Sequence, residues 1–65
     1  MDVIDKLKAR RLELGWSRDT LASKSGYPVN TIGLWERREV SPTLRSLIDW
    51  SQALGLTLET KELSA

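Results

Sequence analysis

Residues 17–35 read Ser-Arg-Asp-Thr-Leu-Ala-Ser-Lys-Ser-Gly-Tyr-Pro-Val-Asn-Thr-Ile-Gly-Leu-Trp, and this stretch decides the fold. Its pattern predicts two short helices joined by a tight turn. Ala22 is small enough to lie where two helices cross at a steep angle, and Gly26 can adopt the positive φ that a reversal of the chain requires. Ile32 and Trp35, three residues apart, form one buried stripe on the second helix. Together these features are typical of a helix-turn-helix motif.

Composition limits what the chain can do. Its 65 residues suffice for one domain with one small core, near the size at which isolated domains are marginally stable, so an oligomer would add stability. Cysteine and histidine are absent, and no acid pair, nucleophile–base pair or glycine-rich phosphate loop is visible. We therefore expect no enzyme, no metal and no cofactor. Without a membrane-spanning run or a signal-peptide profile, we expect a cytoplasmic protein with no membrane partner, and so small a chain has no room for a domain that senses a small-molecule ligand.

The charge of the chain is small overall but unevenly distributed. Residues 6–45 carry nine basic and four acidic side chains, whereas residues 1–5 and 46–65 each have a net charge of −2. A positive middle with acidic ends suits a polyanion that meets one face of the molecule. An ordinary solvated helix surface explains the same distribution equally well.

Apolar periodicity and capping residues predict four helices. We expect them over residues 2–14, 18–24 and 28–37 (or 38), and from residues 41–43 to Gly55. Gly15 ends the first helix, and Ser17 caps the second. The apolar stripe of the fourth helix is expected to comprise Leu44, Leu47, Ile48, Ser51 and Leu54.

Beyond Gly55 the period changes, because residues 56–61 alternate apolar and polar side chains. This alternation predicts a short strand that pairs with the same strand of a second copy across a two-fold axis. A further helical turn or a frayed tail are the alternatives. If the strand pairs across a dimer, Leu56 and Leu58 would form a dimer contact together with Trp50, although partial core packing explains Trp50 about equally well.

Further motifs surround the helix-turn-helix, in order and at regular spacing. They are Leu14-Gly15-Trp16-Ser17, Trp35-Glu36-Arg37, Ser41-Pro42-Thr43-Leu44 and Ala53-Leu54-Gly55-Leu56. Over residues 4–56 the chain resembles the Cro and lambda-repressor class of helix-turn-helix proteins, the XRE-like family. The resemblance implies an all-α fold: a compact four-to-five-helix lambda-repressor-like DNA-binding domain over residues 1–55, followed by a strand or tail over residues 56–65. It also implies that Arg11 pairs with Glu36 as a structural contact, and it supports the C-terminal strand as a dimerisation element.

One face of the third helix is expected to meet a DNA major groove. At 100° per residue, the outward side comprises Val29, Asn30, Gly33, Leu34 and Arg37. The Asn30 amide matches the N6/N7 edge of adenine, and Val29 and Leu34 could pack against thymine methyl groups. Gly33 would let the helix backbone approach the groove closely, unless it is only drift at a solvent position. We expect Val29, Asn30, Gly33 and Leu34 to contact bases.

Contacts with the DNA backbone are expected from basic and hydroxyl side chains around this helix. They are Ser17, Arg18, Thr31, Arg37 and Arg38, with Arg10 and Arg45 as further candidates. Arg18 occupies a position where the family usually has Gln, so it keeps phosphate binding but loses the bracing bonds of an amide. Arg38 replaces a glycine that is common at that point.

The leading hypothesis is a homodimeric, sequence-specific repressor that binds double-stranded DNA at an inverted repeat, with half-sites ~34–36 Å apart. Phage and prophage regulators, including repressors that accompany anti-CRISPR genes, and antitoxins all fit this size. The resemblance thus implies a prokaryotic or phage-infected cell. The second hypothesis is a protein-binding module that docks a toxin or RNA polymerase through Val29 and Leu34.

Overall fold

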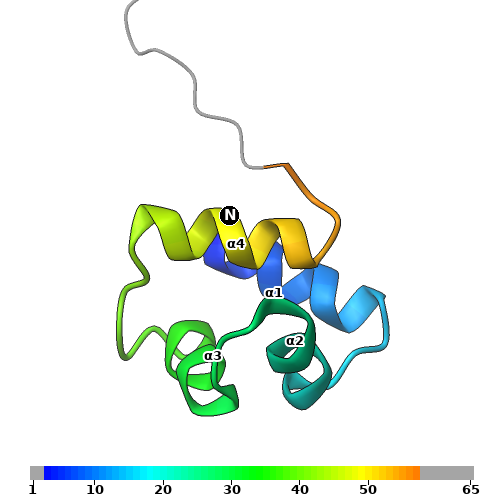
Figure 1. Ribbon diagram of the computed structural model, residues 1–65, viewed down its shortest axis with the longest axis horizontal. Helices are drawn as coiled ribbons and strands as arrows, with labels where there is room; N and C mark the ends of the chain where they lie inside the picture. Colours follow the sequence, from blue (N-terminus) through cyan, green and yellow to red (C-terminus); the bar gives the residue numbers. More distant parts are fainter. Residues whose placement is uncertain (1–2, 58–65) are drawn as a thin grey trace, which may run out of the picture.

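Four helices make up the described part of the chain, residues 3–57 of the computed structural model (Figure 1). They are α1 (Val3–Glu13), α2 (Arg18–Ser25), α3 (Val29–Glu36) and α4 (Leu44–Ala53). The expected all-α fold is confirmed, with helix bounds within about three residues of those predicted from sequence. Residues 58–65, which include Leu58 and most of the expected strand, lie outside the described residues. No helix within residues 3–57 is long and apolar enough to cross a bilayer.

The helix starts follow from side-chain capping. The Ser17 hydroxyl accepts a hydrogen bond from the Thr20 amide at 3.1 Å, and the Thr43 hydroxyl accepts one from the Ser46 amide at 3.1 Å. Each bond satisfies one of the amides that the first turn of a helix leaves without a partner. Pro28 precedes α3 as its N-cap, with its φ of −60° already suited to the helix that follows.

Three helices end with the same pair of backbone hydrogen bonds, the Schellman motif, which requires one residue in the left-handed conformation. That residue is Gly15 after α1 (φ 74°) and Gly55 after α4 (φ 76°), as glycine's conformational freedom favours. After α3 it is Arg38, with φ 63°. Its amide donates to the Trp35 carbonyl at 3.1 Å, and the next amide donates to the Leu34 carbonyl at 2.9 Å. The end of α3 is therefore built around a strained non-glycine residue.

The core is a single apolar cluster to which every helix contributes. Its buried members are Leu7, Leu21, Ile32, Trp35, Trp50 and Leu54. The rings of Trp35 and Trp50 are stacked with centroids 5.3 Å apart, and Tyr27 meets the edge of Trp35 at 5.0 Å. These contacts dock α4 against α2 and α3 (Figure 1), and the hydroxyl of Tyr27, in the turn between α2 and α3, donates to Asp49 of α4 at 2.7 Å.

The position of Trp50 corrects a sequence-based expectation. Its side chain is 0% exposed, so it has no surface left for a second subunit, and core packing is the role that the structure shows. Leu44, expected in the buried stripe, is 60% exposed instead. At 100° per residue the buried face of α4 is turned by roughly 50° toward Trp50, because the large indole has more apolar area to bury. Leu56, the other expected dimer contact that is described, packs partly against the chain's own core.

Candidate nucleic-acid interface

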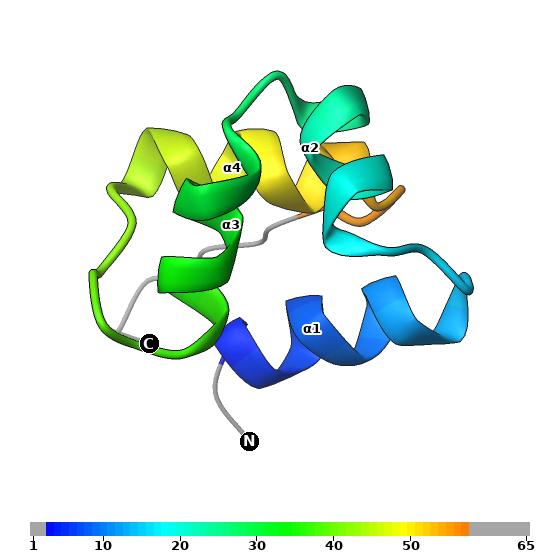
Figure 2. The ribbon, with the colours of Figure 1, turned by 90° about the horizontal axis from the view of Figure 1, so that it is seen from below.

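The outward face of α3 and the start of α2 surround a shallow hollow of about 410 Å³. α2 and α3 lie side by side in both ribbon views, and Figure 2 shows them from below. The hollow is lined by Arg18, Val29, Asn30, Gly33, Leu34 and Arg37. Asn30 and Val29 are exposed there and Leu34 is half-buried. All four residues expected to contact bases therefore line one concave surface, together with two arginines.

Gly33 is placed differently from the expectation. It faces outward but is buried, because arginine side chains cover it. A Cβ at this position would lie 2.9 Å from Nη1 of Arg37 and 3.8 Å from Nη1 of Arg18. The absent side chain thus makes room for two guanidinium groups over the middle of α3, rather than leaving the backbone bare.

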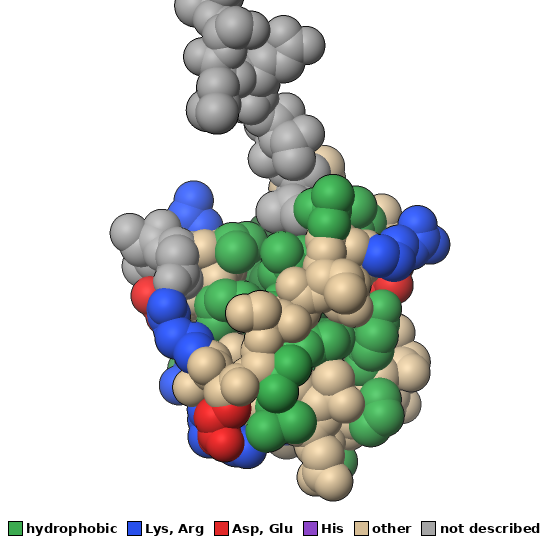
Figure 3. Space-filling view, turned by 90° about the vertical axis from the view of Figure 1, so that its left-hand side faces the viewer, with side chains coloured by type: hydrophobic (Ala, Val, Ile, Leu, Met, Phe, Trp, Pro, Cys, Tyr) green, Lys and Arg blue, Asp and Glu red, His purple; other side chains and the backbone are tan. Residues whose placement is uncertain are grey.

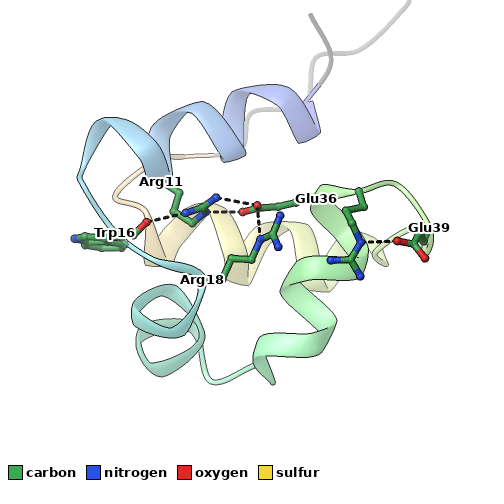
Figure 4. A network of polar contacts seen from close by, with 6 residues as sticks. Arg11, Trp16, Arg18, Glu36 and Glu39 are labelled. Atoms are coloured by element: carbon green, nitrogen blue, oxygen red, sulfur yellow. Dashed lines mark hydrogen bonds and ion pairs between the residues drawn. The ribbon is translucent and has the colours of Figure 1, made fainter.

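A buried carboxylate anchors the ends of three helices (Figure 4). Glu36, whose side chain is 0% exposed, accepts hydrogen bonds from Nε and Nη2 of Arg11 at 2.7 and 3.0 Å. Arg11 also donates to the Trp16 carbonyl at 2.7 Å. The Arg11–Glu36 pair expected from the family resemblance is present, and it joins α1 to the end of α3.

Arg18 joins this network, which the sequence reasoning missed. Its Nε donates to Oε1 of Glu36 at 3.1 Å, and its side chain is 37% exposed. Two arginines therefore share one buried carboxylate, and the arrangement leaves one positive charge in excess. The available signal was an acidic residue at the end of α3 with more hydrogen-bond capacity than one arginine uses.

Three further arginines are paired with carboxylates, of which Glu39 and Asp5 are exposed and Asp49 is half-buried. Nε of Arg37 donates to Oε2 of Glu39. Nη2 of Arg38 lies 2.6 Å from Oδ1 of Asp5. Nε of Arg45 lies 3.4 Å from Oδ1 of Asp49, one helical turn away. Pairs of this kind are weak and exchange readily with an external anion.

Arg10 and Arg45 do not line the hollow. Arg10 donates from Nε to the Leu54 carbonyl at 3.2 Å and pairs with Glu13, so it closes the end of α4. Ser17 caps α2, and Thr31 is half-buried in the first turn of α3. Of the seven expected backbone contacts, Arg18 and Arg37 therefore line the hollow and the other five do not. Among residues 3–57 no group of acidic side chains is arranged to hold a metal ion.

Comparison with known families adds an independent line of evidence. A sequence profile described as helix-turn-helix matches residues 7–61, which is most of the chain and includes both helices around the hollow. Neither the comparison with curated proteins nor the comparison with solved structures gave a match.

Proposed function

Because the chain belongs to the XRE-type helix-turn-helix family of DNA-binding transcription regulators, we propose that it is a dimeric repressor of a small operon. It binds an inverted repeat, with α3 of each subunit in the major groove. The observation that carries this proposal is the outward face of α3, where an exposed amide and apolar side chains lie between two arginines.

The dimensions and chemistry of α3 suit a groove. A helix with its side chains is ~10–12 Å across, close to the ~12 Å width of the major groove of B-DNA, and the eight residues of α3 extend ~12 Å along the helix axis. Asn30 would donate to and accept from one adenine, and Val29 and Leu34 would meet thymine methyl groups. This division of roles requires a half-site with at least one A·T pair.

Phosphates would be bound by the side chains around this face, namely Ser17, Thr31, Arg37 and Arg38. Arg38 supports this role through its backbone, because a left-handed arginine is retained where α1 and α4 end in glycine. Strain of this kind tends to persist where a side chain has a task.

Dimerisation is supported by apolar surface rather than by Trp50. Val40 and Leu44 are 48% and 60% exposed in and just after the connection between α3 and α4. Apolar side chains gather on this side of the molecule, which faces the viewer in Figure 3. A second copy that covers this surface would give two α3 helices related by a two-fold axis, and so an inverted repeat.

Selection of bound duplexes from a random library tests the proposal. We expect an enriched inverted repeat with an A·T pair in each half-site. Binding to this repeat should weaken as salt is added, and the plot of log K against log [salt] should have a negative slope of several units, because each neutralised phosphate releases counterions.

Enrichment of no sequence, with no salt dependence, would overturn the proposal. It would favour docking of a protein, such as a toxin or RNA polymerase, onto Val29 and Leu34.

A further inference from the structure

We propose that Arg18 reads a guanine in the major groove, and that Glu36 positions its guanidinium group for this task. The inference rests on the proposed function of α3 as the helix that enters the groove. It goes beyond phosphate binding, because it assigns Arg18 a share in sequence specificity.

The first step is the anchor. Nε of Arg18 donates to Glu36 Oε1, and Arg11 holds both oxygens of the same carboxylate. Since the Glu36 side chain is fully buried and bonded on both oxygens, it cannot swing out with Arg18. The guanidinium group is therefore fixed along its Nε edge.

The second step is the free edge. Within residues 3–57 neither terminal nitrogen of Arg18 donates a hydrogen bond. Nη1 lies on the outward face of α3, 3.8 Å from the point where a Cβ of Gly33 would stand. The two Nη atoms form a planar fork with a fixed spacing, and the O6 and N7 acceptors of guanine match that fork. An arginine already held by one edge loses little further side-chain freedom on binding.

The third step is the reason to expect that Arg18 contacts a base rather than a phosphate. Arg18 shares the hollow with Asn30 and Val29, the side chains that face the bases in the proposed complex. It reaches the middle of α3, over Gly33, because no side chain there blocks it. A phosphate contact needs only a charge at the edge of the interface, whereas Nη1 of Arg18 lies over the middle of α3. We therefore expect a G·C pair beside the A·T pair that Asn30 reads.

The test uses the operator selected by the wild-type protein and the variants Arg18→Ala and Arg18→Lys. Replacing the guanine read by Arg18 with 7-deazaguanine removes the N7 acceptor and should weaken wild-type binding by about tenfold. The same replacement should change Arg18→Ala binding less than twofold. Arg18→Lys keeps a charge but has no planar fork, so it should discriminate less against other bases at that position than the wild type while keeping the wild-type salt dependence. Arg45→Ala, outside the hollow, should respond to 7-deazaguanine as the wild type does.

A phosphate contact gives different results. Both Arg18 variants would then select the wild-type sequence with uniformly lower affinity, and a methylphosphonate at one phosphate would abolish their difference from wild type. If Arg18→Ala fails to fold, the 7-deazaguanine scan of the wild type and Arg18→Lys still decides, because under a phosphate role every guanine would be equally sensitive in the two proteins. A wild-type protein that enriches no sequence overturns the proposed function together with this inference, whereas enrichment without a sensitive guanine overturns the inference alone.

Discussion

The left-handed backbone at Arg38 allows a prediction that separates the stability of the domain from its DNA binding. A non-glycine residue with φ 63° is strained, and relief of that strain by glycine is worth about 1 kcal/mol after allowing for the greater freedom of glycine in the unfolded chain. Arg38→Ala keeps the strained backbone but loses every contact of the arginine side chain, including the ion pair with Asp5. Arg38→Gly loses the same contacts and relieves the strain. We expect Arg38→Gly to be more stable than Arg38→Ala by about 1 kcal/mol.

The measurement is urea and thermal unfolding followed by tryptophan fluorescence. A difference of about 1 kcal/mol corresponds to roughly 4–8 °C in Tm for a domain of this size. Gly15→Ala provides a calibration, because Gly15 has φ 74° in the same motif with no atom within 4 Å of the added Cβ. Its loss of stability should therefore reflect the backbone alone.

DNA binding should respond differently to the same variants. If Arg38 contacts a phosphate, both substitutions weaken binding equally on all sequences and lower the salt slope by about 1. The backbone argument is refuted if the two variants unfold at the same urea concentration while Gly15→Ala is destabilised.

Three further predictions test the hollow and the dimer. Asn30→Ala should remove the ~1–3 kcal/mol of binding free energy that favours A·T over other base pairs at one position, so that duplex selection no longer enriches a base there. An equal loss of affinity for every sequence would refute base reading by Asn30. Gly33→Ala should raise the free energy of unfolding by ~0.5–1 kcal/mol, because alanine has the higher helix propensity and only the flexible end of Arg37 must move. The same variant should weaken operator binding, and a lower free energy of unfolding would contradict the argument. Leu44→Glu should shift sedimentation toward monomer and remove the dependence of the unfolding midpoint on protein concentration, and an unchanged dimer would exclude this surface.

The local structure of this chain was predictable where a single residue type determines the backbone. Gly15, Gly26 and Gly55 have the positive φ values that helix ends require, and Ser17 caps its helix as its position indicates. The Arg11–Glu36 contact followed from the family resemblance rather than from local chemistry. Each of these inferences depends on a few neighbouring positions or on one known pairing.

The rotation of a helix about its own axis relative to the core was not predictable in the same way. Sequence periodicity gave the fourth helix an apolar stripe that included Leu44, but docking against Trp35 turned that helix and buried Trp50. Burial of Gly33 likewise depends on two arginine side chains, one of which comes from another helix. Such features are set by which surfaces meet, and periodicity within one helix does not contain that information.

Two locally unfavourable residues lie close together in the sequence. Gly33 costs α3 about 1 kcal/mol of helix propensity, and Arg38 strains its end by a similar amount. Gly33 lies on α3 and Arg38 lies two residues beyond its end, and one makes room for guanidinium groups while the other carries one. A small domain is stabilised by only a few kcal/mol, so two such departures in α3 and its C-terminal turn are a large fraction of the total. Departures from local preference are expected at functional sites. If stabilising both positions weakens operator binding, the outward face of α3 is shaped by the ligand that it holds and not by the fold.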